Sequence, residues 1–154
     1  SAVARRLRAF DVKTVGVNRS GHPAAEFDQT QPTCRLDDLL PLADLVICAM
    51  PLTAETAGLF DSVRLAKIKS GAVFVNVARG KVADQQSLGE ALQSGQLSGA
   101  VLDVFEEEPL PRSSPLWEME QVILTPHNSF VGEHNGERLF KCIKEHLYEL
   151  SEEC

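Results

Sequence analysis

Five short apolar runs constrain the fold of this chain more than any other feature of its sequence. They begin at residues 14, 45, 73, 100 and 122, so their starts lie 22 to 31 positions apart. Most of the runs are continuously apolar instead of alternating with polar residues, which is typical of strands covered on both faces of a parallel sheet. The runs are Thr14–Val17, Leu45–Ala49, Val73–Val77, Ala100–Val104 and Val122–Leu124.

Helical patterns lie before and between these runs. The clearest covers Asp84–Ser94, with Asp84 as the N-cap and Gly95 as the stop. Strands that alternate with helices form right-handed βαβ units, so the sequence predicts a doubly wound, Rossmann-type α/β fold with a parallel sheet. Other helices are expected over Ala2–Phe10, near Asp37 and over Ser62–Ile68, while Ser20–Pro32 and Glu106–Pro115 are predicted to be loops.

A longer amphipathic helix is predicted at the end of the chain, over Gly132–Leu150. Its apolar side chains recur at helical spacing and form one stripe, with charged residues elsewhere. We expect this stripe to lie on the sheet. Its members are Leu139, Ile143, Leu147 and Leu150.

The composition excludes several classes of function. The 154 residues carry 22 Asp and Glu against 15 Lys and Arg, and no basic run, which argues against nucleic acid or an anionic membrane as partner. We expect no signal peptide and no membrane span. The cysteines form no C-x-x-C pair and have no His at metal-ligand spacing, so we predict no metal site and a cytoplasmic protein. They are Cys34, Cys48, Cys142 and Cys154.

Three chemically useful side chains follow the last three runs. Arg79 follows the third run, Glu108 the fourth and His127 the fifth. Because parallel strands end at the same edge of a sheet, these side chains are expected to meet in a catalytic crevice. Each has a structural alternative: Arg79 in a helix-capping ion pair, Glu108 as a solvated loop charge and His127 as a turn residue. Their joint placement favours the catalytic interpretation.

Four segments resemble signatures of the D-isomer-specific 2-hydroxyacid dehydrogenase family. They occur in the family's order and spacing over nearly the whole chain, and they match its nucleotide-binding domain only. The segments are Met50–Thr56, Asn76–Gly80, Gly99–Leu110 and Leu124–His127. The resemblance implies hydride transfer between a nicotinamide and C2 of a small 2-oxo or 2-hydroxy acid, such as glyoxylate or hydroxypyruvate.

The resemblance also implies catalytic roles. Arg79 would hold the substrate carboxylate and polarise its carbonyl, His127 would exchange a proton with the substrate oxygen, and Glu108 would bond the imidazole. These roles suit the residue types, since a guanidinium binds a carboxylate through two parallel hydrogen bonds and imidazole titrates near neutrality. A neighbouring carboxylate favours the protonated imidazole. The adjacent acids Glu106 and Glu107 are interpreted as solvated loop charges.

A second set of residues is assigned to the cofactor. By resemblance, Asp103 would accept a hydrogen bond from the nicotinamide carboxamide, its alternative being a helix cap. The residues after the first run are Asn18, Arg19 and Ser20, with no acid to bind a ribose 2′-hydroxyl. Arg19 and Ser20 could instead bond a 2′-phosphate, so NADP(H) is preferred over NAD(H), unless Arg19 is only a solvated loop residue. Pro51, Thr56 and Val77 complete the expected cofactor site.

The sequence also sets expectations for the extent of the domain. No G-x-G-x-x-G fingerprint occurs in it, and the opening helix resembles the one that follows that fingerprint. We therefore expect residues 1–154 to form a partial dinucleotide-binding domain, N-terminally truncated, without the first strand, the glycine-rich loop and the substrate domain. Alone it would be inactive and, because its strand edges are unpaired, poorly stable. The parent would be a homodimer.

Three alternatives remain open at this point. The first is a dinucleotide-sensing, corepressor-like interaction protein, because such relatives can retain the same three side chains. The second is an inactive truncated gene product. The third, within the same enzyme class, is phosphoglycerate oxidation, which requires further cationic groups for the phosphate.

Overall fold

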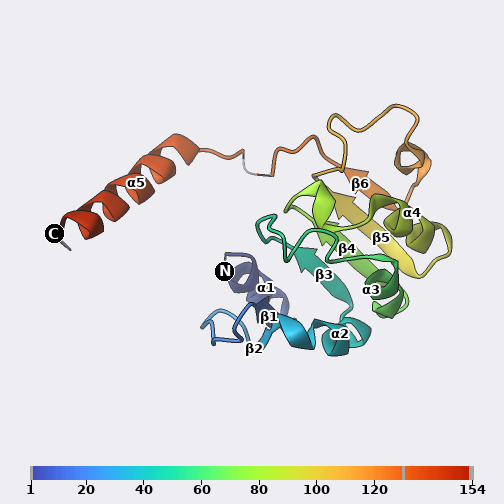
Figure 1. The fold of residues 1–154 in the computed structure, drawn as a ribbon, viewed down its shortest axis with the longest axis horizontal. Helices are drawn as coiled ribbons and strands as arrows, with labels where there is room; N and C mark the ends of the chain where they lie inside the picture. The colour runs from blue at the N-terminus through green and yellow to red at the C-terminus, as the bar shows by residue number, and fades with distance from the viewer. Residues whose placement is uncertain (1, 130, 153–154) are drawn as a thin grey trace.

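The described part of the protein contains six parallel strands arranged in two sheets (Figure 1). In this computed structural model residues 2–129 and 131–152 are described, with side chains as far as residue 144. Strand β1 (Val15–Asn18) pairs with β2 (Gln29–Pro32). The larger sheet has the order β3-β4-β5-β6, formed by Leu45–Cys48, Ala72–Asn76, Leu97–Leu102 and Val122–Leu124. All neighbouring strands are parallel, which confirms the predicted α/β fold.

The helices begin and end close to the predicted positions. Asp61 and Asp84 are N-caps, and their carboxylates accept hydrogen bonds from the backbone N–H groups of Arg64 and Ser87 at 2.9 and 2.7 Å. Gly95 follows the second of these helices with φ +75°, a conformation that glycine adopts without strain. The α-helices are α1 (Ala2–Leu7), α2 (Leu36–Leu39), α3 (Ser62–Lys67), α4 (Gln85–Gln93) and α5 (Asn135–Glu152).

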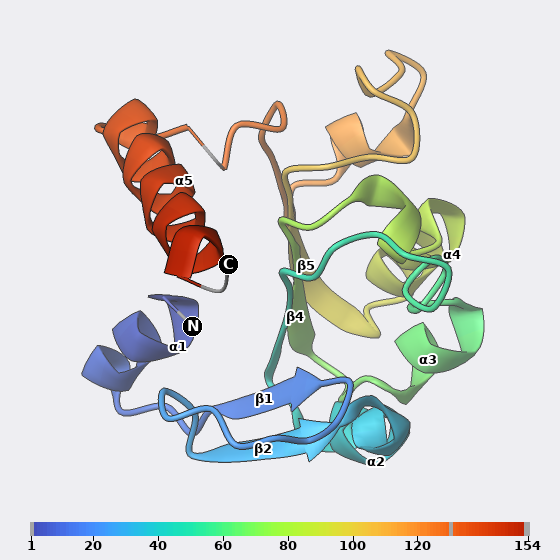
Figure 2. The same ribbon diagram turned by 60° about the vertical axis from the view of Figure 1, so that its left-hand side comes forward.

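The main core lies between the larger sheet and helices α3 and α4, which cover one face of that sheet (Figure 2). At its centre the rings of Phe60 and Phe74 meet edge to face, with centroids 5.1 Å apart. On the opposite face Val73, Val75 and Val101 are half-buried, and Ile123 is 61% exposed. The apolar runs predict strands that are covered on both faces of the sheet. Within the described residues, only the face that packs against α3 and α4 is fully covered.

Strand β2 corrects the prediction that residues 20–32 form a loop. Its sequence, Gln29–Pro32, is polar and ends in proline, so it lacks the apolar pattern of a buried strand. It is an edge strand held by backbone pairing to β1, in the register Val15 to Gln29 through Asn18 to Pro32. An edge strand with no fully buried side chain needs no apolar run, which is why the sequence pattern missed it.

Helix α5 corrects the prediction of a helix lying on the sheet. The helix forms, but it stands away from the strands in both views (Figures 1 and 2). Leu139, Phe140 and Ile143 are 62%, 69% and 50% exposed. The side chains of Leu147 and Leu150 lie outside the described set. An apolar stripe predicts that a helix has a face to bury, but it does not specify which surface covers that face.

Strands β1 and β3 each have one unpaired edge within the described residues. Val15, Val17 and Leu45 are 38%, 41% and 43% exposed, which is high for apolar residues of strands. Their backbone groups on that edge can pair with a further strand.

The described residues include free thiols, but no metal-ligand cluster and no membrane-spanning helix. Cys34, Cys48 and Cys142 carry free thiols, and Cys154 lies outside the described residues. Over the described ranges no three His, Cys, Asp or Glu side chains gather in a way that could hold a metal ion. Nor does any helix there combine the length and apolar character needed to cross a bilayer.

Candidate active site

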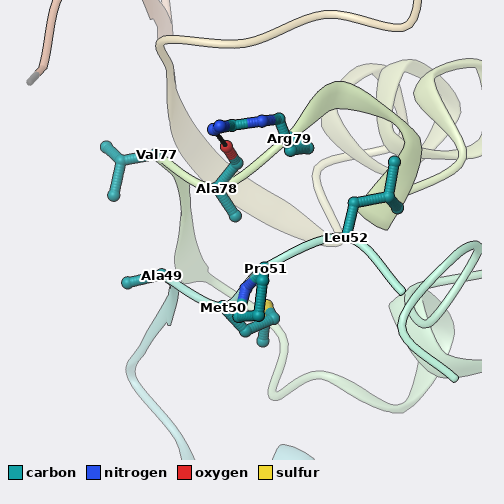
Figure 3. Close-up of a pocket in the computed structure, with 7 residues that line it drawn as sticks. All are labelled: Ala49, Met50, Pro51, Leu52, Val77, Ala78 and Arg79. Carbon is teal, nitrogen blue, oxygen red and sulfur yellow. Dashed lines mark hydrogen bonds between the residues drawn. The ribbon is translucent and has the colours of Figure 1, made fainter. Parts of the chain in front are cut away.

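Two adjoining cavities lie at the carboxyl ends of the strands of the larger sheet. The first, of about 420 Å³, lies between the loops that follow β3 and β4, and Figure 3 shows the side chains around it. The second, of about 300 Å³, is lined by residues that follow β3, β4, β5 and β6. Leu52 and Arg79 line both. The second cavity is lined by Leu52, Arg79, Gly80, Lys81, Phe105, Glu106, Glu108 and His127.

Arg79 is presented by a turn that the buried side chain of Asn76 holds in place. The side-chain Oδ1 of Asn76 accepts a hydrogen bond from the Ala78 N–H at 3.0 Å, and its side-chain amide donates to the Arg79 carbonyl at 3.2 Å. The guanidinium folds back to donate to the Ala78 carbonyl at 2.6 Å (Figure 3). None of the carboxylates among the described side chains forms an ion pair with Arg79, so its predicted alternative, a helix-capping ion pair, is wrong. The cation is available to an anionic ligand.

Gly80 allows the Arg79 turn to approach the loop after β5 closely. A Cβ atom at Gly80 would lie 1.9 Å from the backbone carbonyl atoms of Phe105. Only glycine fits at this contact. The close approach brings Arg79 and Glu108, which come from different strands, to the same cavity.

His127 and Glu108 are in direct contact. The His127 Nδ1 atom lies 2.7 Å from Glu108 Oε2, and each side chain is 34% exposed. The other carboxylate oxygen of Glu108 accepts a hydrogen bond from the Phe105 N–H at 3.0 Å. This backbone N–H, followed by His127 and the charge of Arg79, lowers the pKa of Glu108. Glu108 is therefore an ionised acceptor that fixes the orientation of the imidazole.

Asp103 fastens the loop that carries His127. The side chain is only 1% exposed, and its oxygens accept hydrogen bonds from Thr125 Oγ1 at 2.5 Å and from the N–H groups of Asn128 and Ser129, both at 2.9 Å. Burial alone would raise the pKa of Asp103, but the hydrogen bonds from Ser129, Thr125 and Asn128 outweigh it and lower the pKa to about 2. A nicotinamide contact by Asp103 stays a prediction.

Glu106 is exposed, as expected, but it also forms hydrogen bonds that the sequence did not predict. Its Oε1 atom accepts a hydrogen bond from the Gln85 N–H at 2.7 Å, and its own N–H donates to the Gln85 side-chain oxygen at 3.3 Å. These bonds satisfy an N–H group in the first turn of α4 and tie the loop after β5 to that helix. The neighbouring Glu107 is exposed, as expected.

The residues assigned to the 2′-phosphate lie at the end of β1, apart from both cavities. Asn18 forms the turn: its Oδ1 accepts from the N–H groups of Ser20 and Gly21 at 3.2 and 2.6 Å, and its amide donates to the His22 carbonyl at 2.9 Å. Arg19 and Ser20 are exposed. Arg19 lies 3.2 Å from Glu55 and its side chain is 89% exposed, so both its role at a 2′-phosphate and its alternative as a solvated loop residue stay predictions.

The remaining cofactor candidates fall into two groups. Pro51 and Val77 line the first cavity. Thr56 does not line it; its hydroxyl donates to the Pro51 carbonyl at 2.8 Å and accepts from the Thr53 N–H at 2.8 Å, which closes the loop on itself. Any contact between these residues and a cofactor stays a prediction.

Sequence reasoning missed several residues that shape the site. Asn76 could have been found, because a polar residue ending an apolar strand needs hydrogen-bond partners when it is buried. The structural need for Gly80 and the contact of Glu55 with Arg19 had no local signal. Both depend on segments that meet only in the folded chain.

Comparison with known proteins agrees with this geometry. The family model described as the NAD binding domain of D-isomer specific 2-hydroxyacid dehydrogenase matches residues 1–129. The glyoxylate/hydroxypyruvate reductase B of Citrobacter koseri is 45% identical over 127 residues, covering 82% of this chain and 39% of that protein. The chain therefore spans about two-fifths of the length of the curated relatives it matches.

Two solved structures are similar over nearly the whole chain. The NADPH-dependent glyoxylate/hydroxypyruvate reductase of Sinorhizobium meliloti, in complex with NADP and sulfate, has a TM-score of 0.85 at 32% identity and covers 98% of this chain and 48% of that one. The phosphoglycerate dehydrogenase of Lactobacillus plantarum has a TM-score of 0.83 at 34% identity, covering 98% and 49%. With the family model matched over most of the chain, these findings show that the chain belongs to the D-isomer specific 2-hydroxyacid dehydrogenase family and carries its NAD-binding domain.

Proposed function

We propose that this chain is the cofactor-binding part of an NADP(H)-preferring reductase that converts small 2-oxo acids, such as glyoxylate or hydroxypyruvate, to 2-hydroxy acids. The observation that carries the proposal is the 2.7 Å contact between His127 and Glu108 in a cavity that Arg79 also lines. A permanent cation, a titratable imidazole and a carboxylate that orients it are the groups that this reduction requires.

Each catalytic side chain has a defined task in the proposal. Arg79 binds the substrate carboxylate through paired hydrogen bonds and draws electron density from the carbonyl oxygen. His127 donates a proton from its ring to that oxygen as negative charge develops there. Glu108, held by the Phe105 N–H, keeps the imidazole in one orientation and stabilises its protonated form.

The residues of the chain fit a nicotinamide dinucleotide at two places. The bound cofactor supplies the hydride that reaches C2 of the substrate. Pro51 and Val77 line the cavity beside Arg79, to which the nicotinamide ring is assigned, and Asp103 is assigned to its carboxamide. At the end of β1, Arg19 and Ser20 would bond the 2′-phosphate on the turn formed by Asn18, while Thr56 would keep its loop closed beside the cofactor.

The proposal for the whole protein extends beyond these residues. We assign residues 1–154 to a partial dinucleotide-binding domain and the remaining substrate contacts to a separate substrate domain. The relatives named for glyoxylate and hydroxypyruvate support the choice of substrate, and the similarity to a phosphoglycerate dehydrogenase keeps a phosphorylated 2-hydroxy acid as a competing substrate. A homodimer in the cytoplasm is part of the same proposal.

A direct assay separates these substrates. The full-length protein would be mixed with NADPH or NADH and with glyoxylate, hydroxypyruvate or phosphohydroxypyruvate, and cofactor oxidation would be followed at 340 nm. We expect turnover of the first two acids with a preference for NADPH, and a loss of at least about 100-fold in kcat/KM in Arg79→Lys, because lysine cannot form the paired contact. Wild-type turnover at background, with intact dinucleotide binding, would favour the sensor alternative.

A further inference from the structure

An acidic side chain from a second loop lies beside the residue assigned to the 2′-phosphate. The sequence after β1 contains no acid, but Glu55, in the loop after β3, places Oε1 3.2 Å from the Arg19 guanidinium. The side chains of Arg19 and Glu55 are 89% and 68% exposed. The folded chain therefore supplies a carboxylate where the local sequence has none.

Glu55 is held in this position by its own loop. Its second oxygen accepts a hydrogen bond from Thr53 Oγ1 at 3.2 Å, and its backbone N–H donates to the same hydroxyl at 3.2 Å. The N–H groups of Thr56 and Ala57 close the loop onto the Thr53 carbonyl at 3.2 and 2.9 Å. The carboxylate of Glu55 is thus held by hydrogen bonds within its own loop.

The exposed ion pair does not prevent Arg19 from binding another anion. Pairs this exposed contribute little to stability, so the guanidinium can be shared with a phosphate at low cost. Two acceptors on one guanidinium lie at most about 7 Å apart, since each N–H···O contact spans about 2.9 Å. That separation is within the Debye length of about 8 Å at physiological ionic strength, so the two anions would repel each other.

A ribose hydroxyl would meet the same carboxylate differently. A hydroxyl is uncharged and can donate a hydrogen bond to a carboxylate. In dinucleotide folds the acid that accepts from the ribose 2′-hydroxyl follows the second strand, whereas Glu55 reaches Arg19 from the loop after β3. The carboxylate of Glu55 therefore opposes the phosphorylated cofactor and favours the unphosphorylated one.

We propose that Glu55 is a specificity-determining residue that weakens the preference of this site for NADP(H) over NAD(H). The inference rests on the proposed cofactor site, to which Glu55 adds a negative charge that repels the 2′-phosphate. Selectivity is then set by the balance between Arg19 and Glu55 and not by Arg19 alone.

The test is a binding measurement that needs no turnover. In the full-length protein, Glu55→Gln removes the charge and keeps the size of the side chain, and Glu118→Gln removes one exposed carboxylate elsewhere as the matched control. Dissociation constants for 2′,5′-ADP and 5′-AMP would be measured by calorimetry at low and high salt. Because Glu55 is exposed, the variant should fold normally, and circular dichroism checks that it does.

The expected result is a gain in affinity for 2′,5′-ADP of about three- to fivefold in Glu55→Gln, with no gain for 5′-AMP. The gain should shrink at high salt, and Glu118→Gln should match the wild type. An unchanged affinity ratio, or weaker binding of 2′,5′-ADP, would overturn the inference, the latter by showing that Glu55 positions Arg19.

Arg19→Ala, measured in parallel, separates this inference from the proposed function. If Arg19→Ala weakens 2′,5′-ADP binding while Glu55→Gln has no effect, the cofactor site stands and only the role of Glu55 is wrong. If Arg19→Ala leaves the ratio of the two affinities unchanged, the assignment of the 2′-phosphate site is itself wrong, and the inference about Glu55 fails with it.

Discussion

His127, in the loop after β6, is oriented by hydrogen bonds that start at the backbone of the loop after β5. The Phe105 N–H fixes one oxygen of Glu108, and the other oxygen contacts the imidazole. Asp103 independently fastens the loop after β6 by bonding the N–H groups that follow His127. Two carboxylates thus restrict the position of His127: Glu108 contacts its ring, and Asp103 holds the backbone of its loop.

Replacing Glu108 by Gln tests the first of these restraints. The amide has nearly the same shape but no charge, so it stabilises the protonated imidazole less and can orient the ring wrongly. We expect kcat for glyoxylate to fall about 100-fold with little change in KM. Glu107→Gln, at the adjacent exposed position, is the control and should keep wild-type kinetics. Equal rates in the two variants would show that Glu108 has no role in proton transfer.

Asp103 makes a pH-dependent contribution to stability. Its pKa is about 2 in the folded chain and 3.8 ordinarily, so the ionised form stabilises the fold. That contribution, about 2 kcal/mol, is fully present above about pH 4 and is lost as the pH falls toward 2. Urea unfolding of Asp103→Asn should therefore show a deficit of about this size at pH 7 that narrows at pH 3. A deficit that does not change with pH would mean that lost packing, not charge, is responsible.

At the scale of elements, the cavity lined by Arg79, Glu108 and His127 depends on how closely two loops approach. The turn after β4 and the loop after β5 meet where Gly80 contacts the backbone of Phe105. Glu106 ties the second loop to α4 through Gln85. The strands determine which loops are neighbours, and these contacts determine how near their side chains come.

Gly80→Ala should disturb this contact. The added methyl group would overlap the Phe105 carbonyl, so the loops must separate, and we expect the free energy of unfolding to fall by about 3 kcal/mol. Gly89→Ala, in the interior of α4, is a matched control, because its Cβ would have only Met119 Cε nearby, at 4.0 Å. That variant should be neutral or up to about 1 kcal/mol more stable. Similar unfolding curves for both variants would contradict the account of the loop contact.

The elements that the sequence predicted well are those that contribute to the core. Phe74 and Leu102 lie in buried apolar strands, and Asp84 caps α4 where its spacing indicated. Strand β2 was missed because it is polar and pairs with β1 through its backbone. The position of α5 was wrong because the partner of an apolar stripe is a tertiary property. Prediction failed where long-range contacts decide.

In the candidate site, too, the sequence predicted which residues meet but not the contacts that hold them. Arg79, Glu108 and His127 were predicted to meet because parallel strands end at one edge of a sheet, and they do line one cavity. The partners that hold them could not be read in the same way. Asn76 bonds its own turn, but Glu55 reaches Arg19 from a loop on another sheet. Topology can be inferred from a pattern, whereas individual contacts between loops require the folded structure.

At the scale of the whole molecule, the described residues leave several apolar surfaces uncovered. The unpaired edges of β1 and β3 expose Val15, Val17 and Leu45, and one face of the larger sheet exposes Ile123. Apolar surface that stays in contact with water contributes nothing to the stability of the fold.

Residues 1–154 expressed alone should therefore be less stable than the full-length protein and should not turn over substrate. We expect urea unfolding at a lower midpoint and no oxidation of NADPH with glyoxylate above background. The full-length protein at the same concentration is the control. Robust turnover by the 154-residue chain would refute this prediction.

We propose that His127 transfers the proton during reduction of a 2-oxo acid. The most direct measurement is kcat/KM for glyoxylate with NADPH in the full-length protein and in its His127→Gln variant, with binding of 2′,5′-ADP measured in both. The account predicts a loss of about 100- to 10,000-fold in kcat/KM with unchanged binding of 2′,5′-ADP. A variant that keeps wild-type kcat/KM would contradict it, because the site would then reduce its substrate without the imidazole.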